Sequence, residues 1–178
     1  MKLTKTIATA IALLSVLGSG FTASMLKPSV AKAQNNIVLF GNKENNLPYV
    51  IRNKNPGASR NYIKFYATLP DSRAVAEVQI VYPQEFRSAF VPRKLTVRNR
   101  RSKEEYEVRD ISVDRELNNI RIEFVEPIAA LPNQEIEIVA KSVTNPRHAG
   151  MYRIEVQALG TEANPLFQYL GQWLVSIY

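Results

Sequence analysis

The residues with the clearest chemistry are seven basic side chains between positions 87 and 103, where no acidic residue interrupts them. Guanidinium and ammonium groups gathered in this way form charge-assisted hydrogen bonds with carboxylates, sulfates or phosphates. The stretch predicts an anion-binding patch for a polysaccharide, a phosphate head group or an acidic partner, with Arg98, Arg100 and Arg101 as candidate ligand-binding residues. The seven residues are Arg87, Arg93, Lys94, Arg98, Arg100, Arg101 and Lys103.

Acidic residues directly after this stretch give it a second interpretation. Glu104, Glu105 and Glu107 follow at once, and residues 104–137 hold ten acids against three arginines. A hairpin that turns near residues 100–103 would place a basic strand beside an acidic one. Each cross-strand pair of opposite charges stabilises a sheet by about 0.2–1 kcal/mol. Charge pairing within the fold is therefore the favoured interpretation, and ligand binding is the alternative.

Two tyrosines are candidates for the same binding role. Tyr62 and Tyr66 fall on the polar side of an alternating segment, where two exposed rings could stack on a sugar or a peptide. Tyrosine and tryptophan are common anchors of recognition surfaces. Trp173 lies in the last apolar run of the chain, and we expect it in the core instead.

The sequence offers little that could perform catalysis. His148 is the single histidine, so a serine–histidine–aspartate triad or a zinc site would have to use it. It lies in a turn-like segment, and the chain has no Gly-x-Ser-x-Gly motif. Carboxylate pairs such as Glu135 and Glu137 alternate as on a solvated strand face, and the absence of cysteine excludes disulfides and thiolate metal sites. We therefore predict no catalytic residue, no metal site and no cofactor.

Hydrophobic and polar residues alternate with period two along most of the chain after residue 61. This pattern is typical of strands with one buried and one solvated face. Between Val108 and Ile111 the phase slips by one residue, which predicts a bulge near Arg109 and Asp110. The clearest alternating segments are residues 62–69, 78–82, 94–98, 120–124, 135–141 and 152–158.

Turn-forming residues divide the chain into eight or nine short strands. Proline, asparagine, aspartate and glycine recur between them at spacings of roughly 8–15 residues. The pattern predicts an all-β fold, an immunoglobulin-like antiparallel β-sandwich that lacks the Cys–Trp–Cys signature of antibody domains. Single helical turns are predicted at residues 84–89 and 128–131.

Residues 1–33 are predicted to form a cleaved signal peptide. Lys2 and Lys5 precede an apolar run over residues 7–17, and Ala31-Lys32-Ala33 matches a small-x-small cleavage site. The run is shorter than the roughly 20 residues of a membrane span, so we expect no stable span after cleavage, although an uncleaved segment could act as an anchor. The predicted domains are the signal peptide 1–33, a flexible N-terminal segment 34–60 and a β-sandwich domain 61–178.

Cleavage also changes the charge of the protein. The whole chain carries +7, and four lysines but no acid precede the cleavage site, so the remainder carries only +3. Nucleic-acid-binding domains usually show a strongly basic face. No nucleic-acid partner is therefore predicted.

An ordered set of short motifs resembles a cyanobacterial family, the domain of unknown function 2808. The resemblance covers about residues 60–178, and it implies an exported, periplasmic protein from an oxygenic photosynthetic bacterium. It carries over no catalytic residue. The motifs are Tyr62 with Leu69-Pro70, Phe124-x-x-Pro127, Asn145-Pro146, Gly150-Met151-Tyr152, Gly160, Tyr169-Leu170-Gly171 and Ile177-Tyr178.

Taken together, these features predict an exported, non-enzymatic binding domain of the cell envelope. Its partner would be an envelope protein or a cell-wall or surface glycan. The alternative is a structural subunit of an envelope or thylakoid-lumen assembly, and a hydrolase is the third candidate. The predicted location is the periplasm or the exterior, with the thylakoid lumen as the alternative.

Overall fold

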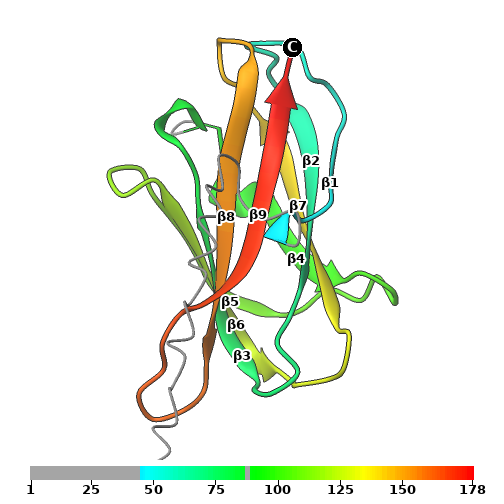
Figure 1. The fold of residues 1–178 in the computed structure, drawn as a ribbon, viewed down its shortest axis with the longest axis vertical. Coiled ribbons are helices and arrows are strands. Elements are labelled where there is room, and N and C mark those ends of the chain that lie inside the picture. The colour runs from blue at the N-terminus through cyan, green and yellow to red at the C-terminus, as the bar shows by residue number, and fades with distance from the viewer. Residues whose placement is uncertain (1–44, 87–88) are drawn as a thin grey trace, which may run out of the picture. The chain divides into compact units, whose positions relative to one another are not determined.

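The computed structural model describes residues 45–86 and 89–178. The predicted signal peptide, residues 1–33, and residues 34–44 of the predicted flexible segment lie outside the described residues. The described chain folds into two antiparallel sheets that face each other (Figure 1). The predicted fold class, an immunoglobulin-like antiparallel β-sandwich, is confirmed.

One sheet has four strands in the order β1-β2-β7-β4, and the other has five in the order β5-β6-β3-β8-β9. Consecutive strands often lie in different sheets, so residues far apart in the chain become neighbours. The strands are β1 (Tyr49–Ile51), β2 (Asn61–Thr68), β3 (Val75–Val81), β4 (Leu95–Asn99), β5 (Val108–Asp114), β6 (Asn119–Ile128), β7 (Glu135–Val143), β8 (Gly150–Gly160) and β9 (Gln168–Ile177).

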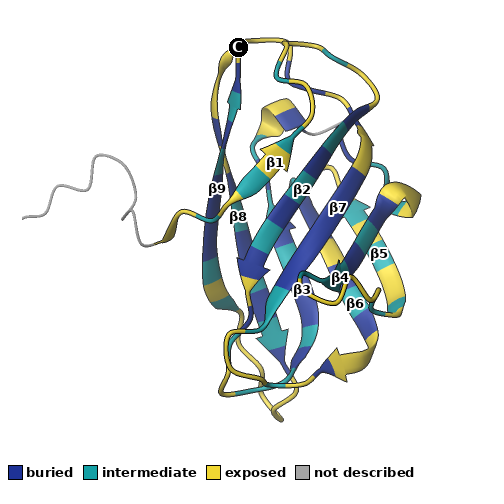
Figure 2. Cartoon of the chain, turned by 90° about the vertical axis from the view of Figure 1, so that its right-hand side faces the viewer, coloured by how far each residue is buried: buried dark blue, intermediate teal, exposed yellow. Residues whose placement is uncertain are grey.

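The predicted alternation places one face of each sheet in a common apolar core. Figure 2 shows buried and half-buried residues alternating along β2. Trp173 of β9 is fully buried, as predicted, and its ring centroid lies 4.6 Å from that of Phe65 on β2. The indole nitrogen donates a 2.9 Å hydrogen bond to the carbonyl oxygen of Tyr66. This one side chain therefore links the two sheets by packing and by a polar contact.

The irregular features follow from local sequence in most cases. The register of β5 against β6 shifts between Val108 and Asp110, which confirms the predicted bulge. The 3₁₀ turn η2 (Gln84–Phe86) lies within the predicted turn at 84–89. The turn predicted at residues 128–131 is wrong, because Ile128 still pairs with Val75 in the sheet and the chain reverses at Asn133, which has a positive φ of 55°.

Another 3₁₀ turn, η3 (Pro92–Lys94), leads directly into β4. Within the described part of the chain, no helix has the length and apolar character needed to cross a membrane.

Strand β1 is an element that the sequence analysis does not predict, because three residues are too few to display an alternation. It pairs with β2 in the four-stranded sheet. The residues around it contact β9 in the other sheet: the Leu47 amide donates to the Gln172 carbonyl at 2.7 Å, and the Tyr178 amide donates to the Lys54 carbonyl at 2.8 Å. Residues 45–54 thus join the two sheets along the edge of β9, and we call them the N-terminal strap.

Candidate ligand-binding face

The outer face of the four-stranded sheet brings most of the predicted binding residues together. On β2, Ile63 and Phe65 point into the core, so the half-buried Tyr62, Lys64 and Tyr66 lie on the outer side. The cross-strand register places Glu137 of β7 between Tyr66 of β2 and Arg98 of β4. We call this surface the basic–tyrosine face. It consists of Tyr62, Lys64, Tyr66, Arg98, Arg100, Lys103, Glu135 and Glu137.

Glu137 is the centre of this face, and its side chain has no exposed surface. Arg98 binds the carboxylate with two groups, Nε at 3.1 Å from one oxygen and Nη2 at 3.0 Å from the other. The ammonium groups of Lys64 and Lys103 lie 3.1 Å and 2.7 Å from carboxylate oxygens. Three cations from different parts of the chain therefore converge on a single buried carboxylate.

These contacts decide the ionisation of Glu137. Burial alone would raise the pKa of its carboxyl group, because burial disfavours the charged form. The hydrogen bonds from Arg98, Lys103 and Lys64 outweigh this effect and lower the pKa to about 2. The hydrogen bond to Glu137 also raises the pKa of Arg98. The Glu137 carboxylate consequently stays ionised at any pH near neutrality.

The cluster carries more positive than negative charge. Three cations surround one carboxylate, and the Lys64, Arg98 and Lys103 side chains remain 26%, 24% and 51% exposed. Glu105 lies opposite Arg98 and offsets part of this excess. Solvent thus reaches cations whose positions are set by Glu137.

Each of the two tyrosine rings forms a cation–π contact with a neighbouring basic side chain. The Arg100 guanidinium lies 4.2 Å from the centroid of the Tyr66 ring and forms a 2.7 Å ion pair with Glu135. The Lys64 ammonium lies 5.5 Å from the centroid of the Tyr62 ring. Both rings are half-buried, and each has a cation over one face. Cation–π contacts of this kind hold a charged side chain in place.

The structure gathers four of the five predicted binding residues, namely Tyr62, Tyr66, Arg98 and Arg100. Arg101 lies instead in the exposed turn between β4 and β5, where its amide donates to Asn99 Oδ1 at 2.8 Å. This turn occupies the predicted position, and Lys103 adopts a positive φ of 64° there. Arg93 and Lys94 lie in η3, and Arg87 is outside the described residues.

Sequence reasoning included Lys103 in the basic stretch but did not single it out, and it missed Lys64 and the central position of Glu137 on this face. The alternation does place Lys64 between the two tyrosines on the same strand face, so that signal was available. The acids that pair with β4 come from β7, because β7 is its neighbour in the sheet. Internal charge pairing and a surplus of cations therefore occur together on one face.

His148 lies in the exposed loop between β7 and β8, where its carbonyl accepts a 2.7 Å hydrogen bond from the Tyr152 hydroxyl. Among the residues that the structure describes, no three histidine, aspartate or glutamate side chains come together in a group that could hold a metal ion.

Several solved structures resemble this chain at very low sequence identity. A collagen-binding domain from a Staphylococcus aureus adhesin is 9% identical, with a TM-score of 0.37, covering 66% of this chain and 87% of that one. ACE19, the collagen-binding subdomain of an Enterococcus faecalis surface protein, is 11% identical, with a TM-score of 0.37 and coverage of 72% and 95%. The RrgA Jo.In complex is 12% identical, with a TM-score of 0.40 and coverage of 71% and 76%. These likenesses concern the fold alone.

A comparison with curated proteins finds no match. The sequence model of a family described as a protein of unknown function, DUF2808, matches residues 37–177. The match spans nearly all of the β-sandwich, including each strand and every residue of the basic–tyrosine face. The chain therefore belongs to the DUF2808 family.

Proposed function

We propose that this protein is an exported, non-enzymatic binding domain of the cell envelope that recognises an acidic protein partner or glycan through the basic–tyrosine face. The observation that carries the proposal is the convergence of Lys64, Arg98 and Lys103 on the fully buried Glu137. The arrangement holds a surplus of positive charge on an ordered sheet. The signal-peptide features of residues 1–33 support export.

Recognition would use the hydrogen-bond donors that Glu137 leaves free. Arg98 engages Glu137 through Nε and Nη2, and each lysine ammonium has three donors of which the carboxylate uses one. A carboxylate or sulfate group of the partner would accept the remaining donors. Because Glu137 already restrains these side chains, binding loses little of their conformational entropy, and restrained donors bind more tightly than mobile ones.

Retention of the purified protein on isolated cell envelopes tests this proposal. The variant Lys64→Gln with Lys103→Gln removes two cations but keeps the two-point contact between Arg98 and Glu137. We expect retention to fall about tenfold or more, since charge-assisted hydrogen bonds contribute about 1.5–3 kcal/mol each, and wild-type retention to weaken as salt is added.

A matched control removes the same charge elsewhere. Arg115 lies in the turn between β5 and β6, and Arg153 lies on β8 in the opposite sheet. The variant Arg115→Gln with Arg153→Gln should retain wild-type binding. Equal retention of the Lys64/Lys103 variant and the wild type would overturn the proposed binding face.

An affinity capture from gently solubilised envelope then separates the two kinds of partner. A stoichiometric protein in the bound fraction identifies a protein partner, whereas enrichment of wall fragments without such a protein identifies a glycan. Both signals should be lost with the Lys64/Lys103 variant.

The alternative of a structural subunit joined through a sheet edge has less support. The edge of β4 is occupied by hydrogen bonds between Asn99 and Glu104 and between Tyr106 and Val97, both 2.9 Å, and the N-terminal strap lies along β9. Within the described residues, β5 and the three-residue β1 are left as edge strands, and β5 carries a bulge and several charged side chains. Bulges and charges are features by which proteins prevent edge-to-edge pairing.

A further inference from the structure

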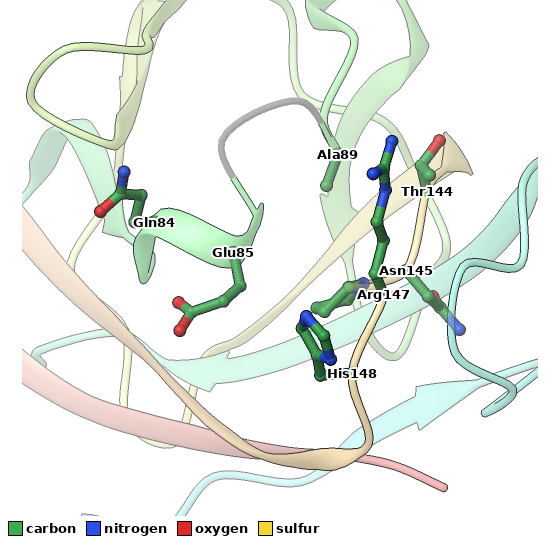
Figure 3. Close-up of a pocket in the computed structure, with 8 residues that line it drawn as sticks. Gln84, Glu85, Ala89, Thr144, Asn145, Arg147 and His148 are labelled. Atoms are coloured by element: carbon green, nitrogen blue, oxygen red, sulfur yellow. The ribbon is translucent and has the colours of Figure 1, made fainter.

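A cavity lies at the end of the sandwich where β9 terminates, away from the basic–tyrosine face. Its volume is about 450 Å³, which falls within the range of about 300–1,000 Å³ typical of small-molecule sites. One wall is the η2 turn, which contributes Gln84 and Glu85, and the opposite wall is the loop between β7 and β8, which contributes Thr144, Arg147 and His148 (Figure 3).

Buried hydrogen bonds hold the loop between β7 and β8 in place. Asn145 is only 3% exposed, and its Nδ2 donates to the carbonyl oxygens of Asn53 and Asn55, both at 2.9 Å. Its Oδ1 accepts a 2.8 Å hydrogen bond from Asn61. Every polar group of this buried amide therefore has a partner, which fixes the backbone that carries Arg147 and His148.

Backbone hydrogen bonds add to this restraint. The Thr144 amide donates to the Ala89 carbonyl at 3.3 Å, which links the two sides of the cavity. The Gly57 amide donates to the Pro146 carbonyl at 2.8 Å, and the Tyr152 hydroxyl donates to the His148 carbonyl at 2.7 Å. The loop is thus anchored at two residues before Arg147 and at His148 itself.

Glu85 and Arg147 carry opposite charges in this cavity, but they do not pair with each other. Glu85 lies on one wall, and Arg147 and His148 lie on the other (Figure 3). Within residues 45–86 and 89–178, the Glu85 carboxylate, the Arg147 guanidinium and the His148 imidazole form no hydrogen bond or ion pair. A cavity that keeps a carboxylate and a guanidinium apart suits a ligand that bridges them.

We propose that this cavity binds a small zwitterion of the class of short peptides with a free ammonium and a free carboxylate group. The Arg147 guanidinium would bind the ligand carboxylate in a two-point contact, and the His148 ring would add a further hydrogen bond. Glu85 would accept hydrogen bonds from the ligand ammonium. The inference does not depend on the function proposed for the basic–tyrosine face.

His148 makes a direct test simple, because it is the single histidine of the chain and gives a unique imidazole signal in NMR spectra. Titration of the purified protein with alanyl-alanine should shift this signal in a saturable manner. The doubly capped analogue, N-acetyl-alanyl-alanine amide, has the same backbone without charges and should leave it unchanged. The singly capped analogues should bind at least about tenfold more weakly, since each lacks one charge-assisted contact.

Variants then assign the site. Glu85→Gln and Arg147→Gln should each weaken the affinity for alanyl-alanine about tenfold or more, while Arg115→Gln, a change in a remote exposed turn, should leave it unaltered. Spectra that otherwise match the wild type verify that each variant is folded.

Two results would overturn the proposal: the absence of a saturable shift with alanyl-alanine, or equal binding of the capped and uncapped peptides. The Lys64/Lys103 variant should bind alanyl-alanine normally, and a loss of binding there would contradict the assignment to this cavity.

Discussion

Glu137 illustrates how one side chain can serve both stability and binding. A buried ion pair is not in itself evidence of high stability, because the cost of removing charges from water offsets their attraction. Removing one partner of such a pair is strongly destabilising, because the remaining charge is left without a counter-charge. Here three cations, Lys64, Arg98 and Lys103, depend on the same carboxylate. We therefore expect Glu137 to be more sensitive to substitution than the other acids of the sheet.

The variant Glu137→Gln should lower the free energy of unfolding by about 2–4 kcal/mol, because it leaves three neighbouring cations without an anion. Urea unfolding monitored by circular dichroism measures this change. Glu123→Gln is the matched control, since Glu123 pairs with Arg109 at 2.7 Å but its side chain is 45% exposed. That variant should lose no more than about 1 kcal/mol. Similar losses for both variants would contradict the central role of Glu137.

The lowered pKa of Glu137 predicts that the stability of the protein depends on pH. The pKa of Glu137 is about 2 in the folded protein against an ordinary value of 4.5, so the folded state binds this proton less readily than the unfolded state does. Its contribution to stability is fully present above about pH 4.5 and is lost as the pH falls towards 2. Thermal unfolding over this range should show a steep fall for the wild type. A fall of equal steepness in Glu137→Gln would show that other carboxyl groups are responsible.

At the scale of elements, one edge of each sheet is covered by a segment that is not a regular strand of that sheet. Residues 104–106 lie beside β4, and the N-terminal strap lies beside β9. Gly171 of β9 makes the close approach of the N-terminal strap to β9 possible. It has a φ of +145°, and a Cβ atom there would lie 2.7 Å from the carbonyl oxygen of Asn45.

Gly171→Ala should therefore displace the strap from β9 and destabilise the protein by about 1–3 kcal/mol. Hydrogen exchange should localise the effect to residues 45–54, through faster exchange of the Leu47 amide. Gly150→Ala is a suitable control, because a Cβ atom at that position would make only ordinary contacts, 3.5 Å and more from Tyr152. Equal protection of Leu47 in the two variants would show that the strap does not need the close approach at Gly171.

At the scale of the whole molecule, the two sheets share one core, and Trp173 lies in it. Phe65 and Trp173 pack between the sheets, and the indole hydrogen bond reaches the backbone of β2. Neither sheet can therefore unfold without exposing the single tryptophan of the chain.

Unfolding should consequently be cooperative. Trp173 fluorescence and far-ultraviolet circular dichroism should give the same transition midpoint in urea, as expected for a single domain of this size. Trp173→Phe keeps an aromatic ring but loses the bond to the Tyr66 carbonyl, so its free energy of unfolding should fall by about 1–3 kcal/mol. Two separate transitions in the wild type would contradict a shared core.

Local patterns in the sequence were sufficient to predict much of the fold. The period-two alternation identifies the inward residues of β2, β6 and β8, because successive side chains of a strand point to opposite faces. The phase slip near Arg109 predicts the bulge of β5 for the same reason. The candidate residues Tyr62 and Tyr66 were also found in this way, since alternation assigns both to a solvated face. Arg98 and Arg100 were found from the uninterrupted run of basic residues instead.

Tertiary structure alone decided which strands are neighbours, and therefore which of these side chains come into contact. Arg98 binds Glu137, which lies 39 positions further along the chain, because β7 is the neighbour of β4 within its sheet, while the following segment lies along the other edge of β4. Nothing in the alternation of either strand specifies that partner, since many pairings bury the same apolar faces. The strap, the convergence of three cations on Glu137 and the cavity between η2 and the β7–β8 loop all depend on that arrangement. Strand positions follow from local periodicity, whereas neighbours follow from the packing of the complete core.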